Sequence, residues 1–180
     1  MRRLAGLDNP FTLVQPATDD VTQVRGAMDT ISLGEGRDPP ESQVEGLYQL
    51  ATGEGISPFV QPSLGCPSGG RGYACVRDDA LPIVLLFTDN AMHNGPGGAN
   101  SYADIFSVRP HTYDEAVLAL NELGAHVIGF DSGSGAGWPH LVSLATDTNT
   151  LGADGSPLVF RLGERGEGLG NQVVDAVRTF

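Results

Sequence analysis

The chain has 180 residues, enough for one domain with a sizeable core, and we treat residues 1–180 as a single domain. Hydrophobic residues make up 40%, charged residues 18%, and the mean hydropathy is −0.09, a globular composition that argues against disorder and, with no long apolar run, against a membrane span. The net charge of −12, with ten Arg and no Lys, argues against a nucleic-acid partner, because a phosphate backbone would be repelled.

The first third of the chain contains a strand candidate and two helix candidates. Residues 11–14 form a short apolar run, and we expect a strand there. Residues 18–20 offer an N-cap, and the apolar residues after them recur at helical spacing, which predicts a helix to about Ile31. A second helix is predicted over 40–51, because Pro favours the first turn and an apolar side follows at helical spacing.

Residues 52–80 are rich in Gly and Pro and predict a long loop that contains the two cysteines, Cys66 and Cys75. The turn-rich segment between them can bring its ends together. A loop-closing disulfide is the interpretation we favour, and two free thiols are the alternative. A disulfide would indicate an oxidising compartment, so we expect a secreted or cell-surface protein, although no signal peptide is visible in this chain.

The most informative segment is 82–89, a short apolar run without turn residues. Such a run is typical of a strand that is buried on both faces of a parallel sheet. Asp89 follows at the carboxyl end of this strand, where α/β sheets place their ligand sites.

The C-terminal half alternates between helix and strand patterns. It predicts a helix over 111–123 that Gly124 ends, a strand over 126–130, a Gly-rich loop over 131–137, a helix over 139–146, a strand over 157–162 and a closing helix over 171–180. This order predicts right-handed crossovers and an α/β fold with a mostly parallel sheet. Nothing upstream supplies an evident neighbour for the strand that ends at Asp89, so we expect an open sheet edge and self-association through it.

The order and spacing of these segments resemble the von Willebrand factor A superfamily, and within it the βI-like domain of integrin β subunits. Four segments carry the resemblance: the turn Asp38-Pro39-Pro40-Glu41-Ser42, the strand Leu85-Leu86-Phe87-Thr88-Asp89 with His93 after it, the helix and strand over 113–130, and the short helix over 141–146. The resemblance implies a doubly wound, Rossmann-like sheet with helices on both faces and a ligand-binding or adhesion function.

The resemblance also implies a divalent-cation site. It assigns Glu41 and Asp89 to the adhesion site, and Asp38 with the carbonyl of Pro40 to a neighbouring calcium site. The family's Asp-x-Ser-x-Ser loop is absent, and the segment 131–134 has a similar composition but follows the wrong strand. We therefore expect an N-terminally incomplete domain that binds Mg²⁺ or Ca²⁺ weakly, on the order of millimolar. Its partner would be a protein ligand, bound through a carboxylate.

Each acidic position also has a structural interpretation. Glu41 can complement a helix dipole, Asp38 can be a turn or N-cap residue, and Asp89 can cap a turn. A metal-free structural or protein-interaction domain of the same fold is therefore the alternative function. We do not expect an enzyme, because the sequence has neither a nucleophile elbow nor a P-loop. A hydrolase that uses the carboxylates of Glu41 and Asp89 is a weaker alternative.

Overall fold

The structure is a computed structural model that describes residues 9–32, 38–66, 69–102, 108–133, 135–163 and 168–180. The elements follow one another as α1 (Val21–Met28), α2 (Gln43–Thr52), β1 (Ile83–Thr88), the short 3₁₀ helix η1 (Pro96–Gly98), α3 (Tyr113–Leu123), β2 (His126–Asp131), α4 (Trp138–Asp147), β3 (Val159–Arg161) and α5 (Leu169–Val177). None of the described helices is long and apolar enough to cross a membrane.

The described strands form a parallel sheet in the order β1-β2-β3. Each strand is followed by a helix, and helical crossovers are what allow neighbouring strands to run parallel. The register places Thr88, Asp131 and Arg161 in one row at the carboxyl end of the sheet. The prediction of an α/β fold with a parallel sheet is confirmed, and the arrangement is compatible with a Rossmann-like fold.

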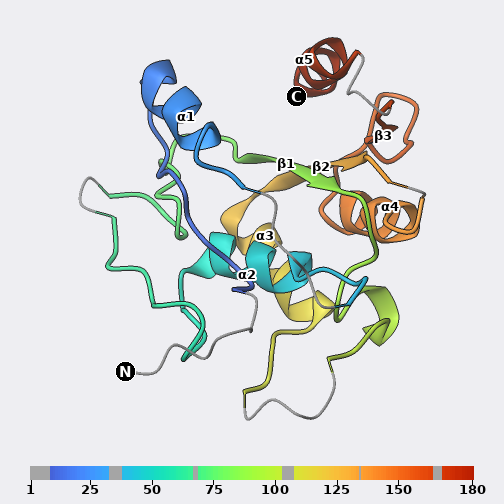
Figure 1. The fold of residues 1–180 in the computed structure, drawn as a ribbon. Helices are drawn as coiled ribbons and strands as arrows, with labels where there is room; N and C mark the ends of the chain where they lie inside the picture. Colours follow the sequence, from blue (N-terminus) through green and yellow to red (C-terminus); the bar gives the residue numbers. More distant parts are fainter. Residues whose placement is uncertain (1–8, 33–37, 67–68, 103–107, 134, 164–167) are drawn as a thin grey trace.

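The main hydrophobic core lies on one face of the sheet. Helices α2, α3 and α4 pack there, below the sheet in Figure 1, around side chains such as Leu120 and Leu141 that are 0% and 1% exposed. A smaller cluster lies on the opposite face, where Ile128 and Phe130 pack against residues of α5. Apolar residues on both faces of β2 explain why its sequence is an almost unbroken apolar run.

Local sequence signals account for the ends of several helices. Asp20 caps α1 by accepting hydrogen bonds from the amides of Thr22 and Gln23. Thr112 and Glu115 form a reciprocal capping box at the start of α3. Gly124 ends α3 with a φ of 73°, a left-handed conformation that glycine adopts without strain.

The strand predicted over 11–14 is wrong, because these residues form neither a helix nor a paired strand. Phe11 packs edge-on against Tyr73, with 5.2 Å between ring centroids, and the amide of Ala17 donates to the carbonyl of Ala74. In the described structure this run has no neighbouring strand to pair with, and it contacts the loop around Tyr73 instead.

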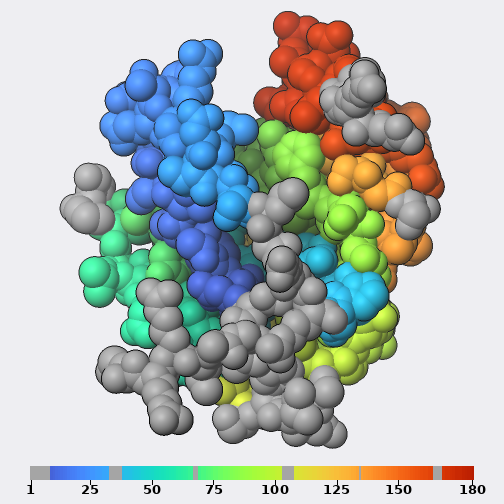
Figure 2. Space-filling view, in the orientation of Figure 1, coloured from blue at the N-terminus to red at the C-terminus, as the bar shows by residue number. Residues whose placement is uncertain are grey.

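Within the described residues, β1 pairs with β2 on one side and lies at the edge of the sheet. This agrees with the prediction that the strand ending at Asp89 lacks a second neighbour. Figure 2 shows part of this region at the surface, between α1 and α5.

Candidate functional site

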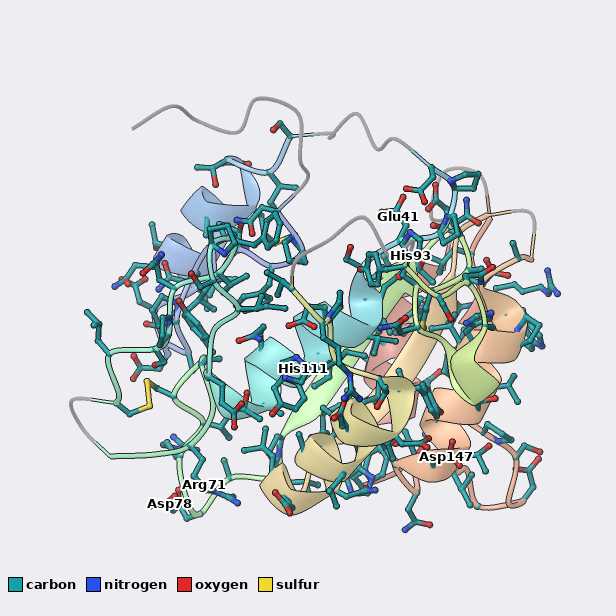
Figure 3. The ribbon with its side chains drawn as sticks, turned by 90° about the horizontal axis from the view of Figure 1, so that it is seen from below. Glu41, Arg71, Asp78, His93, His111 and Asp147 are labelled. Carbon is teal, nitrogen blue, oxygen red and sulfur yellow. A yellow bond between two sulfur atoms is a disulfide. The ribbon has the colours of Figure 1, made fainter. Side chains whose placement is uncertain are left out.

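The structure brings two of the predicted acidic segments together at the carboxyl end of β1. The amide of Glu41 donates to the carbonyl of Ala91 at 2.9 Å, and the amide of His93 donates to the carbonyl of Glu41 at 2.8 Å. These bonds form a parallel bridge between Glu41 and Met92, and Figure 3 shows Glu41 and His93 as neighbours. The turn at 38–42 therefore lies against the segment that follows Asp89.

Asp38 is held by His93, a residue for which the sequence predicts no chemical role. The Nε2 atom of His93 lies 3.0 Å from Oδ2 of Asp38, and its Nδ1 atom lies 2.7 Å from the carbonyl oxygen of Asn100. His93 is 8% exposed, whereas the side chain of Asp38 is 61% exposed. The contact spans 55 positions, and no local signal in the sequence could have revealed it.

Tyr102 packs against the pair formed by Asp38 and His93. Its ring stacks on the His93 ring with 4.1 Å between centroids, and its hydroxyl donates to Oγ of Ser42 at 2.8 Å. Burial raises the pKa of Tyr102, so the phenol stays protonated at neutral pH and can donate this hydrogen bond. The contacts fix His93 and Ser42 relative to each other.

Asp89 is exposed at the end of β1, beside the buried Thr88. The Thr88 hydroxyl accepts a hydrogen bond from Nε2 of Gln43 and donates to the carbonyl of Asn90, which ties α2 to the end of β1. Gly133 lies so close to Asp89 that a Cβ at this position would overlap the Asp89 carbonyl oxygen. The loop after β2 therefore packs directly against the loop that carries Asp89.

Asp131 is the most deeply buried carboxylate at this edge, at 1% exposed. Its Oδ1 atom accepts from the amide of Gly133 at 3.1 Å, and its Oδ2 atom lies 3.7 Å from Nη1 of Arg161. Arg161 in turn lies over the ring of Trp138, at 4.6 Å from the ring centroid. Asp131 is not among the predicted site residues, although its position directly after a predicted strand is a sequence signal for this edge of the sheet.

The donors assigned to the metal do not fit a closed metal centre. Hard cations such as Ca²⁺ take six to eight oxygen ligands, roughly. Asp38 is already engaged by His93, Asp89 is exposed, and Pro40 is only partly buried. Among the described residues, no group of three or more His, Cys, Asp or Glu side chains is placed to hold a metal ion.

The predicted disulfide between Cys66 and Cys75 is present, with 5.3 Å between the Cα atoms. Beside it, the backbones of Arg71 and Val76 exchange two hydrogen bonds of 2.8 Å, and the Arg71 side chain lies 3.4 Å from Asp78. Figure 3 shows Arg71 and Asp78 far from Glu41. The disulfide therefore stabilises the long loop at a distance from the acidic edge.

A hollow of about 210 Å³ opens at the opposite end of the sheet from Asp89. It is lined by the last residues of α2 and α3 and by Arg71. Its position at the amino ends of the strands is not where parallel sheets place ligand sites, so we assign it no role in binding.

A buried polar network under α2 was not predicted either. Glu45 is 1% exposed and accepts hydrogen bonds from the amide and ring Nδ1 of His111, at 2.8 and 3.0 Å, and from Nε2 of Gln49 at 2.7 Å. His111 also stacks on Tyr48, with 3.5 Å between ring centroids. The network joins α2 to the segment that precedes α3, and we interpret it as structural.

The fold and the acidic edge define an α/β protein with a parallel sheet whose carboxyl end carries exposed carboxylates. No protein-family model matches the chain, and no similar curated protein was found.

Proposed function

We propose that this chain is a protein-binding module whose ligand contacts lie at the carboxyl ends of β1 and β2. The observation that carries the proposal is the parallel bridge between Glu41 and Met92, which sets the turn of Asp38 and Glu41 beside the segment that follows Asp89. Exposed carboxylates on two adjacent loops, backed by the rigid contacts of His93, form a preorganised acidic surface.

The ligand best suited to this surface is basic. Without a cation, the carboxylates of Asp38 and Asp89 attract an Arg or Lys side chain and repel an acidic one, and the net charge of −12 acts in the same direction. With a bound Mg²⁺ or Ca²⁺, the same edge could accept a ligand carboxylate, as the resemblance to the von Willebrand factor A superfamily implies. The observed donors support the metal-free form, because too few converge for tight cation binding.

The doubly wound arrangement, the membership of that superfamily and the secreted or cell-surface location are further parts of the proposal. The last of these is supported by the disulfide between Cys66 and Cys75.

Calorimetric titration of chelator-treated protein with Mg²⁺, Ca²⁺ and Mn²⁺ tests which form operates. We expect no saturable heat at millimolar cation, on the order of the weakest calcium modules. A saturable heat that is lost in Asp89→Asn but kept in Asp79→Asn would establish the cation-dependent form. Asp79 is the matched control, because it is an exposed Asp at the other end of β1.

Chemical-shift mapping with arginine methyl ester tests the basic ligand directly. We expect concentration-dependent shifts at residues 38–41 and 88–93 that Asp89→Asn reduces and Asp79→Asn does not. Shifts confined to other parts of the molecule would contradict the proposed location.

A further inference from the structure

The outer edge of β1 carries backbone groups that have no partner strand. The carbonyls of Pro82 and Thr88 accept hydrogen bonds from amides of the β2 chain segment, so the even-numbered positions of β1 face β2. The N–H and C=O groups of Ile83, Leu85 and Phe87 therefore point away from β2. Within the described part of the chain, no backbone hydrogen bond reaches them.

Exposed apolar side chains lie beside this edge. Phe87 is 45% exposed although its ring stacks on Phe130. Helix α1 lies on the side of β1 that faces away from β2, and none of its residues is buried (Figures 1 and 3). We use the name β1 edge surface for the outer edge of β1, the exposed side chain of Phe87, and helix α1 on this side of the sheet.

The rim of the β1 edge surface is acidic. Asp19, Asp20 and Asp29 flank α1, Asp89 follows β1, and all four are exposed, whereas Arg25 is the basic residue that α1 itself carries. No ion pair joins any of these carboxylates to another residue that the structure describes. An apolar centre with an acidic rim favours a partner with basic flanks, whereas two copies of a chain with net charge −12 repel each other.

We propose that the β1 edge surface binds an extended segment of a partner protein, in which alternating apolar residues are flanked by basic ones, by adding it to the sheet beside β1. Backbone hydrogen bonds to Ile83, Leu85 and Phe87 would provide affinity for an extended backbone. Apolar side chains on one face of the added strand would cover Phe87, and basic flanking residues would reach the acidic rim. Because β1 has six residues, the added strand would have about the same length.

The probe is a fluorescently labelled synthetic peptide of about ten residues, in which Val alternates with Thr between pairs of Lys. Binding is measured by fluorescence anisotropy. One control peptide has the same sequence with N-methyl groups on alternate amides, so it cannot donate the edge hydrogen bonds. Another has Ser in place of every Lys. We expect binding to weaken at least about tenfold for the first and several-fold for the second, and to weaken between about 0.05 M and 0.5 M NaCl.

Leu85→Pro tests the edge from the protein side. Proline removes a donor from the outer edge and leaves the bonds between β1 and β2 in place, because the amide of Leu85 faces away from β2. We expect at least tenfold weaker peptide binding, with Leu118→Ser, an exposed position on α3, as the unaffected control. If circular dichroism shows that Leu85→Pro does not fold, the comparison of the parent and N-methylated peptides decides whether the peptide binds by hydrogen bonds to the edge of β1.

Three results would overturn the proposal. The first is no binding of the parent peptide, and the second is equal binding of the parent and N-methylated peptides. The third is a dimer of the wild-type protein in which a second copy covers the β1 edge surface. Light scattering detects the last. The parent and N-methylated peptides carry the same Lys residues, so equal binding of the two would reject strand addition at β1 and leave the proposed contacts of a basic ligand with Asp89 to the arginine ester experiment.

Discussion

Replacement of Glu45 tests whether the buried network under α2 holds the fold together. Its carboxylate is almost completely shielded from water and accepts three hydrogen bonds of 2.7 to 3.0 Å, two from His111 and one from Gln49. Around it, burial and a hydrogen bond to Glu54 raise the pKa of Tyr48 to about 12, so the neighbouring phenol remains a donor. Each donor to Glu45 would lose its partner if the carboxylate were removed.

The expected cost follows from these contacts. A buried hydrogen-bond donor that is left without its acceptor costs about 1–3 kcal/mol, and Glu45→Ala leaves three such donors, so we expect it to lower the free energy of unfolding by at least about 3 kcal/mol. Glu45→Gln keeps the shape and one acceptor oxygen, but its new NH₂ group must face the amide of His111 or the side chain of Gln49, both of which are donors. We expect it to cost about 1–3 kcal/mol.

Urea unfolding with linear extrapolation measures both values. Glu122→Gln is the matched control, because Glu122 is an exposed residue of α3, and we expect a change within about 0.5 kcal/mol. A cost below about 0.5 kcal/mol for Glu45→Gln would refute the claim that the network is an important source of stability.

Three other changes test separate features. Gly133→Ala should lower the free energy of unfolding by about 1–3 kcal/mol, because the added methyl group overlaps a backbone carbonyl. The control is Gly46→Ala in α2, where the added methyl group has ordinary contact distances and should change the free energy of unfolding by no more than about 1 kcal/mol. Equal effects of the two substitutions in urea unfolding would contradict this reasoning. Replacing both Cys66 and Cys75 by Ser should lower the free energy of unfolding by about 2–3 kcal/mol, because the disulfide closes a loop over a sequence separation of nine. An unchanged unfolding midpoint would show that the disulfide does not constrain the unfolded chain. Burial lowers the pKa of His140 in the folded protein. As the pH falls below about 6.5, the unfolded chain therefore binds a proton at His140 before the folded protein does, and the free energy of unfolding decreases. His140→Asn should reduce the dependence of the free energy of unfolding on pH between about pH 5 and pH 7. An unchanged slope in this range would rule out His140 as the source of the pH dependence.

The sequence determined most of the local structure, because the responsible signals lie within a few residues of one another. The apolar run at 82–89 became β1, and the periodic apolar residues before Gly124 became α3. The cysteine pair was recognisable because a turn-rich segment of eight residues, 67–74, lies between the two cysteines. The exception, the predicted strand at 11–14, shows the limit of such signals, since a strand also needs a neighbour to pair with.

The tertiary structure decided which distant residues meet. His93 contacts Asp38 across 55 positions and His111 contacts Glu45 across 66, and neither pair has a periodic or motif signal in the sequence. The same holds for the strand order, which depends on how the crossover helices pack rather than on the strands themselves. Local sequence therefore specified the elements and the acidic residues at strand ends, and packing across the sheet specified the surface that those residues form.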